Sequence, residues 1–252
     1  MPHQFARTLL LLGALPLAVV TLRAETVLAP MKIFLLIGQS NMAGRGVVEA
    51  EDKLPHPRVF MLTKELARVP AVDPMHYDKP ERIGTGLGKT FGAVLADADS
   101  AATIGLVPAA FGGSALDEWV PGAPHYVDAV ARAKEAMKRG QLAGILWHQG
   151  ESDSDPAKAA TYAERFAKVI AQLRADLNAA DVPVIIGETG RFREDGAAIN
   201  AALATVPARV PFCVFVPANG LNDKGDKLHF DSPSLREFGR RYAQAWLSTV
   251  KR

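Results

Sequence analysis

Short apolar segments alternate with longer helical segments along most of this chain, and that alternation limits its fold more than any other feature. Compact apolar runs rich in β-branched residues predict buried strands at residues 32–37, 103–107, 144–147, 182–186 and 212–216. Helical patterns are expected near residues 91–98, 126–139, 157–178, 197–205 and 234–250. Because strands that alternate with helices are joined by right-handed crossovers, we predict an α/β fold, a three-layer α/β/α sandwich with a parallel sheet of about five strands.

One stretch, residues 45–82, has no clear period and is rich in proline, histidine and charge. We expect it to be an insertion or a surface loop that shapes a substrate cleft. Open parallel sheets bind ligands beyond the carboxyl ends of their strands. Polar motifs that directly follow a strand are therefore the first candidates for a functional site.

The N-terminus has the pattern of a secretory signal peptide. Arg7 precedes a short apolar stretch that Pro16 interrupts, and Ala24 is a small residue suited to cleavage. A helix that spans a membrane needs about 20 apolar residues, more than this stretch supplies. We therefore expect residues 1–24 to be removed and residues 25–252 to form a single domain. The protein would then be exported, periplasmic or extracellular, without stable membrane insertion.

The charge balance argues against some classes of partner. The whole chain has 29 Lys and Arg against 27 Asp and Glu, and residues 1–24 carry Arg7 and Arg23 but no acidic residue. Removing that segment leaves 27 of each sign, so the remaining chain is formally neutral. A neutral chain without a clustered basic face gives no reason to expect nucleic acid as a partner. Cys213 is the single cysteine, and we interpret it as a small buried hydrophobe.

The motif Gly-Gln-Ser-Asn-Met-Ala-Gly at residues 38–44 directly follows the first predicted strand. A serine at such a turn lies near the amides of a helix N-terminus, which suits Ser40 as a nucleophile. The alternative is a serine that only caps a helix, a common role for a serine after a strand. The motif is not Gly-x-Ser-x-Gly, so it does not match the nucleophile elbow of the α/β-hydrolases.

A serine nucleophile needs a base, and histidine is the usual one. Asp226 and His229 are three residues apart, just before the last predicted helix. One loop can therefore present an imidazole together with the carboxylate that sets its tautomer. Taken alone, the pair would be interpreted as surface residues in a polar turn.

Two further motifs follow strands and offer hydrogen-bond donors to an oxyanion. After the second strand, Gly112 and Gly113 would leave backbone amides accessible. After the third strand, Gln149 offers a side-chain amide. Each motif also has an ordinary interpretation, as a simple turn and as polar surface.

Four motifs, at residues 38–44, 111–114, 147–153 and 226–230, occur in the order and spacing of the SGNH (GDSL-like) hydrolases. They most resemble the branch that contains carbohydrate esterase family 6 and the sialate O-acetylesterases. The segment at residues 230–242 is similar to that branch as well, and the resemblance is weakest at residues 45–82.

This resemblance implies a flavodoxin-like sheet and metal-free hydrolysis of acyl esters, with no cofactor and an acetylated carbohydrate, of the acetylxylan or sialic acid O-acetyl type, as substrate. Ser40 would be the nucleophile, His229 the base and then the acid, and Asp226 the residue that orients the histidine. The oxyanion would be held by the Ser40 amide, by the amide of Gly112 or Gly113, with Gly113 preferred, and by Gln149. Residues expected to support the site or contact substrate are Gln39, Asn41, Gly112, His148 and Glu151.

Other interpretations compete with this one. Residues 84–90 look like a phosphate loop but lack its first glycine and a preceding strand. His148 and Glu151 do not have the spacing of a metal-binding motif. Trp119 and Tyr126 would suit either stacking on a sugar or packing in the core. The alternative functions are a catalytically silent carbohydrate-binding protein and a lipase-like or thioesterase-like hydrolase of longer acyl chains.

Overall fold

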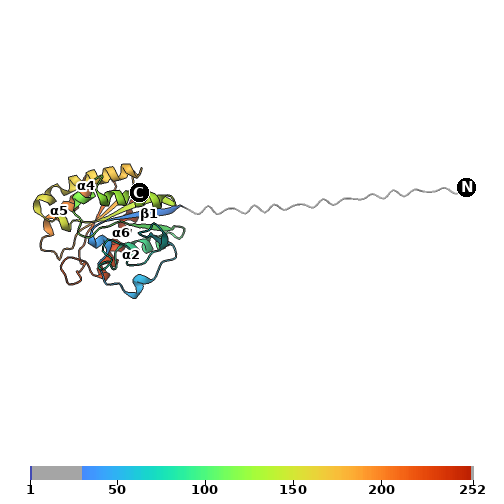
Figure 1. Cartoon of the computed structure of the whole chain (residues 1–252), viewed down its shortest axis with the longest axis horizontal. Coiled ribbons are helices and arrows are strands. Elements are labelled where there is room, and N and C mark those ends of the chain that lie inside the picture. Colours follow the sequence, from blue (N-terminus) through green and yellow to red (C-terminus); the bar gives the residue numbers. More distant parts are fainter. Residues whose placement is uncertain (2–29, 251–252) are drawn as a thin grey trace.

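The computed structural model of the chain describes Met1 and residues 30–250 (Figure 1). The predicted signal peptide lies outside the described residues. None of the helices within residues 30–250 is both long enough and apolar enough to cross a membrane.

The sheet contains all five expected strands, in parallel and in the order β4-β1-β5-β6-β7. Their bounds are Met31–Gly38 for β1, Ile104–Pro108 for β4, Gly140–His148 for β5, Val184–Gly187 for β6 and Cys213–Val216 for β7. Numbered by chain position among these five, the order is the 2-1-3-4-5 order of flavodoxin-like folds. In such folds the ligand lies at the switch point beside the first strand, which here is the carboxyl end of β1.

Two more strands extend the sheet to seven, and both lie in the segment that we expected to be a loop. Strand β2, Val59–Leu62, pairs in parallel with β4, and β3, Arg68–Pro70, pairs antiparallel with β2 at the sheet edge. Strand β2 is only four residues long, and β3 is a half-exposed edge strand that ends in proline. Strands β6 and β7 are also four residues long and were predicted, so length alone does not explain the difference; β2 and β3 lie in a segment rich in proline, histidine and charge whose sequence has no clear period.

Helices cover both faces of the sheet, as predicted (Figure 1). Along β1, Ile33, Leu35 and Ile37 belong to one buried cluster, while Phe34 and Leu36 belong to the other, because successive strand residues point to opposite faces. The first cluster packs under α3 (Pro124–Met137), α4 (Pro156–Asp176) and α5 (Ala197–Thr205), and the second under α2 (Gly88–Ala98) and α6 (Ser232–Val250).

Local signals account for where the longest helix begins. The Asp155 carboxylate accepts hydrogen bonds from the amides of Ala157 and Lys158, at 2.9 and 3.2 Å, and Pro156 occupies the first position of α4. The cap satisfies amides that have no partner inside the helix, and proline needs no partner there. This start agrees with the prediction within one residue.

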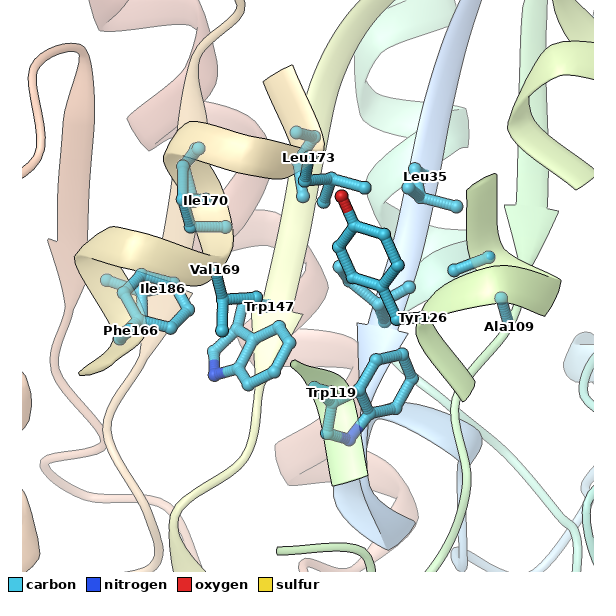
Figure 2. Packing of buried hydrophobic residues seen from close by; sticks show 14 of the residues in the cluster. Leu35, Ala109, Trp119, Tyr126, Trp147, Phe166, Val169, Ile170, Leu173 and Ile186 are labelled. Carbon is cyan, nitrogen blue, oxygen red and sulfur yellow. The ribbon is translucent and has the colours of Figure 1, made fainter. Parts of the chain in front are cut away.

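Trp119 and Tyr126 pack in the core, which decides between the two roles considered for them (Figure 2). They are 1% and 4% exposed, and the Trp119 ring meets the Trp147 ring edge to face with 5.5 Å between centroids. Their position excludes stacking on a sugar in this conformation. Cys213 lies partly buried in β7, and burial raises the pKa of its thiol to about 12.

Candidate active site

Ser40 is the first residue of the short helix α1, Ser40–Ala43, which begins where β1 ends. Before it, Gly38 has a φ of +129°, and a Cβ atom there would lie 2.1 Å from the backbone oxygen of His148. Only glycine lets the end of β1 lie this close to β5, so the turn that presents Ser40 depends on it. Ser40 is 6% exposed and lines an open cavity.

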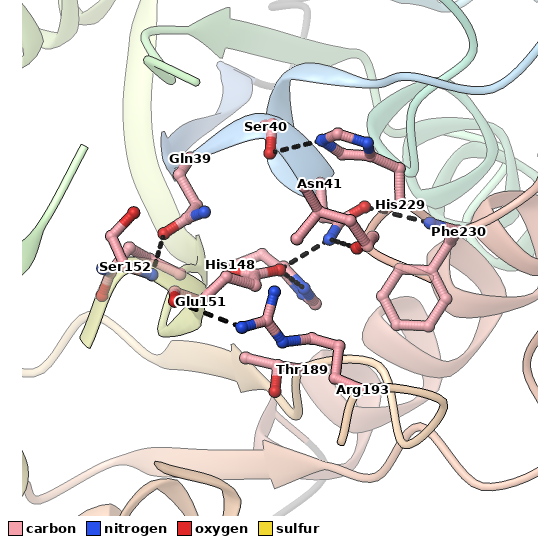
Figure 3. A network of polar contacts seen from close by, with 12 residues as sticks. Gln39, Ser40, Asn41, His148, Glu151, Ser152, Thr189, Arg193, His229 and Phe230 are labelled. Atoms are coloured by element: carbon pink, nitrogen blue, oxygen red, sulfur yellow. Dashed lines mark hydrogen bonds and ion pairs between the residues drawn. The ribbon is translucent and has the colours of Figure 1, made fainter. Parts of the chain in front are cut away.

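The loop between β7 and α6 brings His229 and Asp226 to Ser40, and Figure 3 shows His229 beside Ser40. His229 Nε2 lies 3.1 Å from Ser40 Oγ, and His229 Nδ1 lies 2.7 Å from Asp226 Oδ2. A carboxylate beside Nδ1 favours the tautomer with its proton on that nitrogen. Nε2 is then free to accept the proton of the Ser40 hydroxyl, so the three side chains form one hydrogen-bonded series.

Asp226 is a carboxylate at neutral pH. Its partial burial raises the pKa, but hydrogen bonds from the backbone and side chain of His229 and from the Leu228 amide outweigh burial and lower the pKa to about 2. Asp226 Oδ1 accepts the Leu228 amide at 3.0 Å and the His229 amide at 2.8 Å. The same contacts close the loop into a turn around the carboxylate.

Asn41 ties this loop to the serine turn (Figure 3). Its Nδ2 donates to the backbone oxygen of Leu228 at 3.2 Å, and its Oδ1 accepts the amide of Phe230 at 3.1 Å. These two residues flank His229 in the chain, so the Asn41 side chain holds the backbone on both sides of the histidine. Asn41 is fully buried and adjacent to Ser40, which makes the distance between base and hydroxyl depend on it.

His148 and Glu151 form a buried polar layer behind Asn41 (Figure 3). Asn41 Nδ2 donates to Glu151 Oε1 at 2.6 Å, and the same oxygen lies 3.7 Å from His148 Nε2. Burial raises the pKa of Glu151, but the nearby His148 ring and the Asn41 amide outweigh burial and leave the pKa below its ordinary value. An ionised Glu151 therefore accepts a hydrogen bond from Asn41 and holds the Asn41 side chain in place.

The glycine turn after β4 has one engaged amide and one free amide. Gly112 N donates to Asp78 Oδ2 at 2.7 Å. Gly113, with a φ of +87°, has no hydrogen-bond acceptor for its amide among the described residues, and neither does the amide of Ser40. Both residues line the same cavity. The free amides of Ser40 and Gly113 are thus available to an oxyanion.

Gln149 makes contacts that differ from those expected from the sequence. Its side chain is fully buried, and Nε2 donates to Asp153 Oδ2 at 2.7 Å and to the backbone oxygen of Ser114 at 3.2 Å. Its Oε1 accepts the hydroxyl of Tyr162 at 2.6 Å. Both amide hydrogens are engaged, so in this arrangement Gln149 supports the glycine turn from behind and offers no hydrogen to the cavity.

Gln39 lies on the cavity wall, where its Oε1 accepts the amide of Ser152 at 3.3 Å. Ser152 in turn donates from its hydroxyl to the backbone oxygen of Gly113 at 3.0 Å. Through these contacts the loop after β5 joins the serine turn to the glycine turn. We did not expect Ser152 to contribute, because a serine in a polar loop gives no distinguishing signal.

The cavity in front of Ser40 has a volume of about 690 Å³. Its side chains come from the loops after β1, β4, β5, β6 and β7 and from the segment at residues 45–82. The lining is mostly polar or charged, and the residues are Gln39, Ser40, Arg45, Lys79, Glu81, Arg82, Gly112, Gly113, Glu151, Ser152, Arg193, Lys224, Asp226, Leu228 and His229.

Five basic residues of this lining escaped the sequence analysis. Arg45, Lys79 and Arg82 lie in the segment without a readable period, and Arg193 and Lys224 lie in loops after β6 and β7. The sequence contains one clue, since Arg45 directly follows the serine motif. Among the described residues, no group of His, Cys, Asp and Glu side chains is arranged to hold a metal ion.

Several known proteins are similar to this chain. A family model described as "Carbohydrate esterase, sialic acid-specific acetylesterase" matches residues 30–248. A probable carbohydrate esterase of Arabidopsis thaliana is 34% identical over 248 residues, which cover 89% of this chain and 93% of that protein. The crystal structure of an Arabidopsis thaliana protein superposes with a TM-score of 0.81 at 32% identity, over 87% of this chain and 98% of that one.

Two more distant structures share the fold. NanS matches with a TM-score of 0.72 at 20% identity, over 89% of this chain and 99% of that one. A carbohydrate acetylesterase from Xanthomonas citri matches with a TM-score of 0.67 at 19% identity, over 87% of this chain and 57% of that one. Since the family model covers nearly all the described residues, the chain belongs to the family of carbohydrate esterases described as sialic acid-specific acetylesterases, and it is a carboxylic ester hydrolase.

Proposed function

We propose that the protein is a serine esterase that removes acetyl groups from carbohydrates, with Ser40 as nucleophile, His229 as general base and acid, and Asp226 as the residue that orients His229. The observation that carries the proposal is the hydrogen-bonded series from Ser40 Oγ through His229 to Asp226, which opens onto one cavity. His229 is 189 residues from Ser40 in the sequence, yet their side chains are hydrogen-bonded. Neither a serine that only caps a helix nor a surface Asp–His pair would need to meet a residue so distant in the chain.

In this mechanism Ser40 Oγ attacks the acetyl carbonyl carbon while His229 Nε2 takes the hydroxyl proton. The negative charge that develops on the carbonyl oxygen is held by the amides of Ser40 and Gly113. His229 then gives its proton to the departing sugar oxygen, which leaves the acetyl group on Ser40. A water molecule deprotonated by His229 attacks the acetyl carbon, and His229 returns that proton to Ser40 Oγ as acetate leaves. Each oxyanion donor lowers the barrier by about 3–4 kcal/mol in comparable sites.

The composition of the cavity wall favours a short acyl group. Leu228 is the single large apolar residue in the lining, and a long acyl chain would need a continuous apolar groove to leave water. An acetyl group needs no such groove. The wall therefore argues against a lipase-like or thioesterase-like activity on longer chains.

The charges around the cavity favour a sugar that carries an anionic group. Five basic side chains line it against three acidic ones. Four of the bases pair with a carboxylate, Arg45 with Asp78, Arg82 with Glu81, Arg193 with Asp195 and Lys224 with Asp226, which leaves Lys79 without an ion pair among the described residues. A carboxylate on the substrate would be attracted by Lys79, whereas neutral xylan would gain nothing from it. An O-acetylated sialic acid is therefore the preferred substrate type over acetylxylan.

Hydrolysis of p-nitrophenyl acetate, butyrate and octanoate by the mature chain, from about Glu25, tests the catalytic proposal. Acetate should be the best substrate, and Ser40→Ala should abolish turnover. Ser248→Ala, at an exposed serine on α6, is the matched control and should retain wild-type activity.

The sugar is tested with O-acetylated sialic acid against acetylated xylo-oligosaccharides, by measuring released acetate at low and high salt. Preference for the sialic acid that weakens at high salt would agree with the charge argument, because salt screens exposed charges. If the folded wild type and Ser40→Ala were equally inactive on every ester, the esterase proposal would be refuted and the carbohydrate-binding alternative favoured.

A further inference from the structure

Arg45 and Asp78 form a buried ion pair at the edge of the site, inside the segment that the sequence left without a role. Arg45 Nη2 lies 2.6 Å from Asp78 Oδ2, and the two side chains are 4% and 0% exposed. Burying two charges costs free energy that their attraction repays only when geometry and further hydrogen bonds are good. The further hydrogen bonds of this pair lead to two different loops of the site.

On one side, Arg45 Nη1 donates to the backbone oxygen of Gly44 at 2.8 Å, and the Gly44 amide donates to the backbone oxygen of Ser40 at 2.9 Å. On the other side, Asp78 Oδ2 accepts the Gly112 amide at 2.7 Å. The pair therefore connects the end of helix α1 to the glycine turn. These two loops supply the two free amides, those of Ser40 and Gly113.

The amides after β4 alternate in direction. The amides of Ala109 and Phe111 donate to the backbone oxygens of Leu36 and Gly38, both at 2.9 Å, and so continue the pairing of β4 with β1. The next odd-numbered amide, that of Gly113, comes where β1 has already turned into α1. It therefore has no strand acceptor and remains free beside Ser40.

The even-numbered amides point to the segment that contains Asp78. The Ala110 amide donates to His76 Nδ1 at 3.2 Å, and the Gly112 amide donates to Asp78. Burial lowers the pKa of His76 to about 3, so the ring is neutral and can accept this hydrogen bond. The side chains of His76 and Asp78 thus hold one edge of the loop after β4, and β1 holds the other edge.

At Gly112 any larger residue would have to displace the Arg45–Asp78 ion pair. A Cβ atom there would lie 2.3 Å from Arg45 Nη2 and 2.8 Å from Asp78 Oδ2. The glycine therefore lets the ion pair press directly against the backbone of the turn.

We propose that Asp78 and Arg45 are positioning residues for the oxyanion hole: by holding the Gly112 amide and the Gly44 carbonyl together, they set the Gly113 amide at the distance from Ser40 that a tetrahedral oxyanion requires. This inference rests on the proposed serine-esterase mechanism. It gives residues 45–82 a role in positioning the oxyanion hole, whereas a surface loop or a cleft wall would have no such role.

A matched pair of variants separates positioning from simple stability. Asp52 lies in the same segment, is also buried, and also accepts hydrogen bonds from an arginine, Arg236 at 2.9 Å, and a backbone amide, that of Glu49 at 2.9 Å. It makes no contact with the glycine turn among the described hydrogen bonds. Asp52→Asn should therefore lower the melting temperature without lowering kcat for p-nitrophenyl acetate.

Asp78→Ala should lower kcat by about 10- to 100-fold with little change in KM, somewhat less than the 10²–10³-fold cost of deleting a donor outright. Asp78→Asn keeps an oxygen that can accept the Gly112 amide, so it should recover part of the loss. Arg45→Met should resemble Asp78→Ala, because it leaves the Asp78 carboxylate buried and unpaired.

The second readout is inhibition by a trifluoromethyl ketone, whose carbonyl carbon bonds to Ser40 Oγ while His229 takes the proton and the ketone oxygen becomes an oxyanion. In Asp78→Ala its Ki should rise by the same factor by which kcat/KM falls, whereas the affinity for the product sugar should stay unchanged. Wild-type kcat in Asp78→Ala, or a loss of kcat with unchanged Ki, would overturn the inference.

If Asp78→Ala does not fold, Asp78→Asn is measured with the same two readouts and the same criteria. Wild type is assayed in parallel. An inactive folded wild type would refute the proposed function itself, whereas an active wild type with fully active Asp78 variants would refute this inference alone.

Discussion

The candidate site has two halves that are built differently. The nucleophile half lies where β1, β4 and β5 end, and Ser40, at 6% exposure, sits among hydrogen bonds that continue the strand pairing. The acid–base half lies on the loop before α6, where the Asp226 side chain is 37% exposed. Side-chain contacts from Asn41 and the turn around Asp226 hold that loop in place.

Because the two halves are built differently, we expect substitutions in them to affect stability and activity differently. Changes at the strand ends disturb packed backbone as well as the site, so they should lower both stability and turnover. Changes on the loop disturb few buried contacts, so they should lower turnover with little effect on stability. Three variants are ordered from the largest to the smallest expected effect on catalysis: the first two test this division, and the third tests how a buried carboxyl group outside both halves makes stability depend on pH.

His229→Ala should give the largest loss, a fall in kcat of about 10⁴-fold or more, because the base of a Ser-His-Asp series is removed. The melting temperature should stay near that of wild type, since the histidine lies on a partly exposed loop. His56→Ala is the matched control, because His56 also pairs with an aspartate, Asp97, at 3.1 Å but lies away from the cavity.

Steady-state kinetics with p-nitrophenyl acetate and a thermal melt of both histidine variants make the measurement. A His229→Ala protein with appreciable activity would remove the acid–base assignment. A large fall in its melting temperature would instead break the proposed division, because the loop would then be part of the stable framework.

Asn41 lies in the nucleophile half and contacts the acid–base half, so Asn41→Ala should lower both stability and kcat. It removes the hydrogen bonds to Leu228 and Phe230 and leaves the buried Glu151 carboxylate without its 2.6 Å donor. Leaving a buried polar group unpaired costs about 1–3 kcal/mol of stability. We expect kcat to fall by about 10- to 100-fold as the loop that carries His229 shifts.

Chemical denaturation and kcat measured on the same preparation test this prediction. Asn200→Ala is the control, because the Asn200 side chain also holds a loop backbone: its Oδ1 accepts the amide and the hydroxyl of Thr189 at 3.0 and 2.7 Å, and its Nδ2 donates to the Thr189 backbone oxygen at 3.3 Å. It should lose stability but keep its kcat. Equal loss of kcat in both variants would mean that Asn41 acts through general stability and does not position the loop.

Asp73→Asn should have the smallest effect on catalysis and a clear effect on the pH dependence of stability. Burial raises the pKa of Asp73 to about 8, and the charge of Asp52 adds to this, against the Gly86 amide and the cations Lys89 and Arg236. A raised pKa in the folded state means that wild-type stability falls as pH rises from about 4 to about 8, by up to about 1.4 kcal/mol per pH unit.

Asparagine cannot ionise, so Asp73→Asn should lack this decline. Urea denaturation of both proteins from pH 5 to pH 9 measures it, and parallel pH profiles for the two proteins would contradict the prediction. Asp226, with its pKa of about 2, is ionised throughout this range and does not contribute to the slope.

Much of the fold and part of the site follow from local sequence patterns. The five predicted strands are all present, since each is a compact apolar run; β1, β4 and β6 are almost fully buried in the parallel sheet, and β7 is partly buried. Ser40, Asp226 and His229 were selected because each lies just after a strand or just before a helix, where the chain must leave the sheet edge. Parallel strands bring such positions together at one edge, whatever the intervening sequence.

Other features depend on partners that are distant in the chain, and there the sequence alone was insufficient. Strand β2 forms because β4 supplies its backbone partners, and β3 forms because β2 supplies them; the surrounding sequence has no period that marks either strand. The Gln149 amide points to Ser114 and Asp153 instead of the cavity, because the fold places these acceptors beside it.

By itself, the sequence determined the alternation of elements, the parallel sheet and the residues at its open edge, because these follow from periodicity and turn chemistry over a few residues. Only the tertiary structure decided which amide stays free for an oxyanion, since Gly112 finds its acceptor 34 residues away in Asp78 while Gly113 finds none among the described residues. A hydrogen bond needs its partners within about 3 Å, and no local pattern encodes which distant residues the fold brings that close.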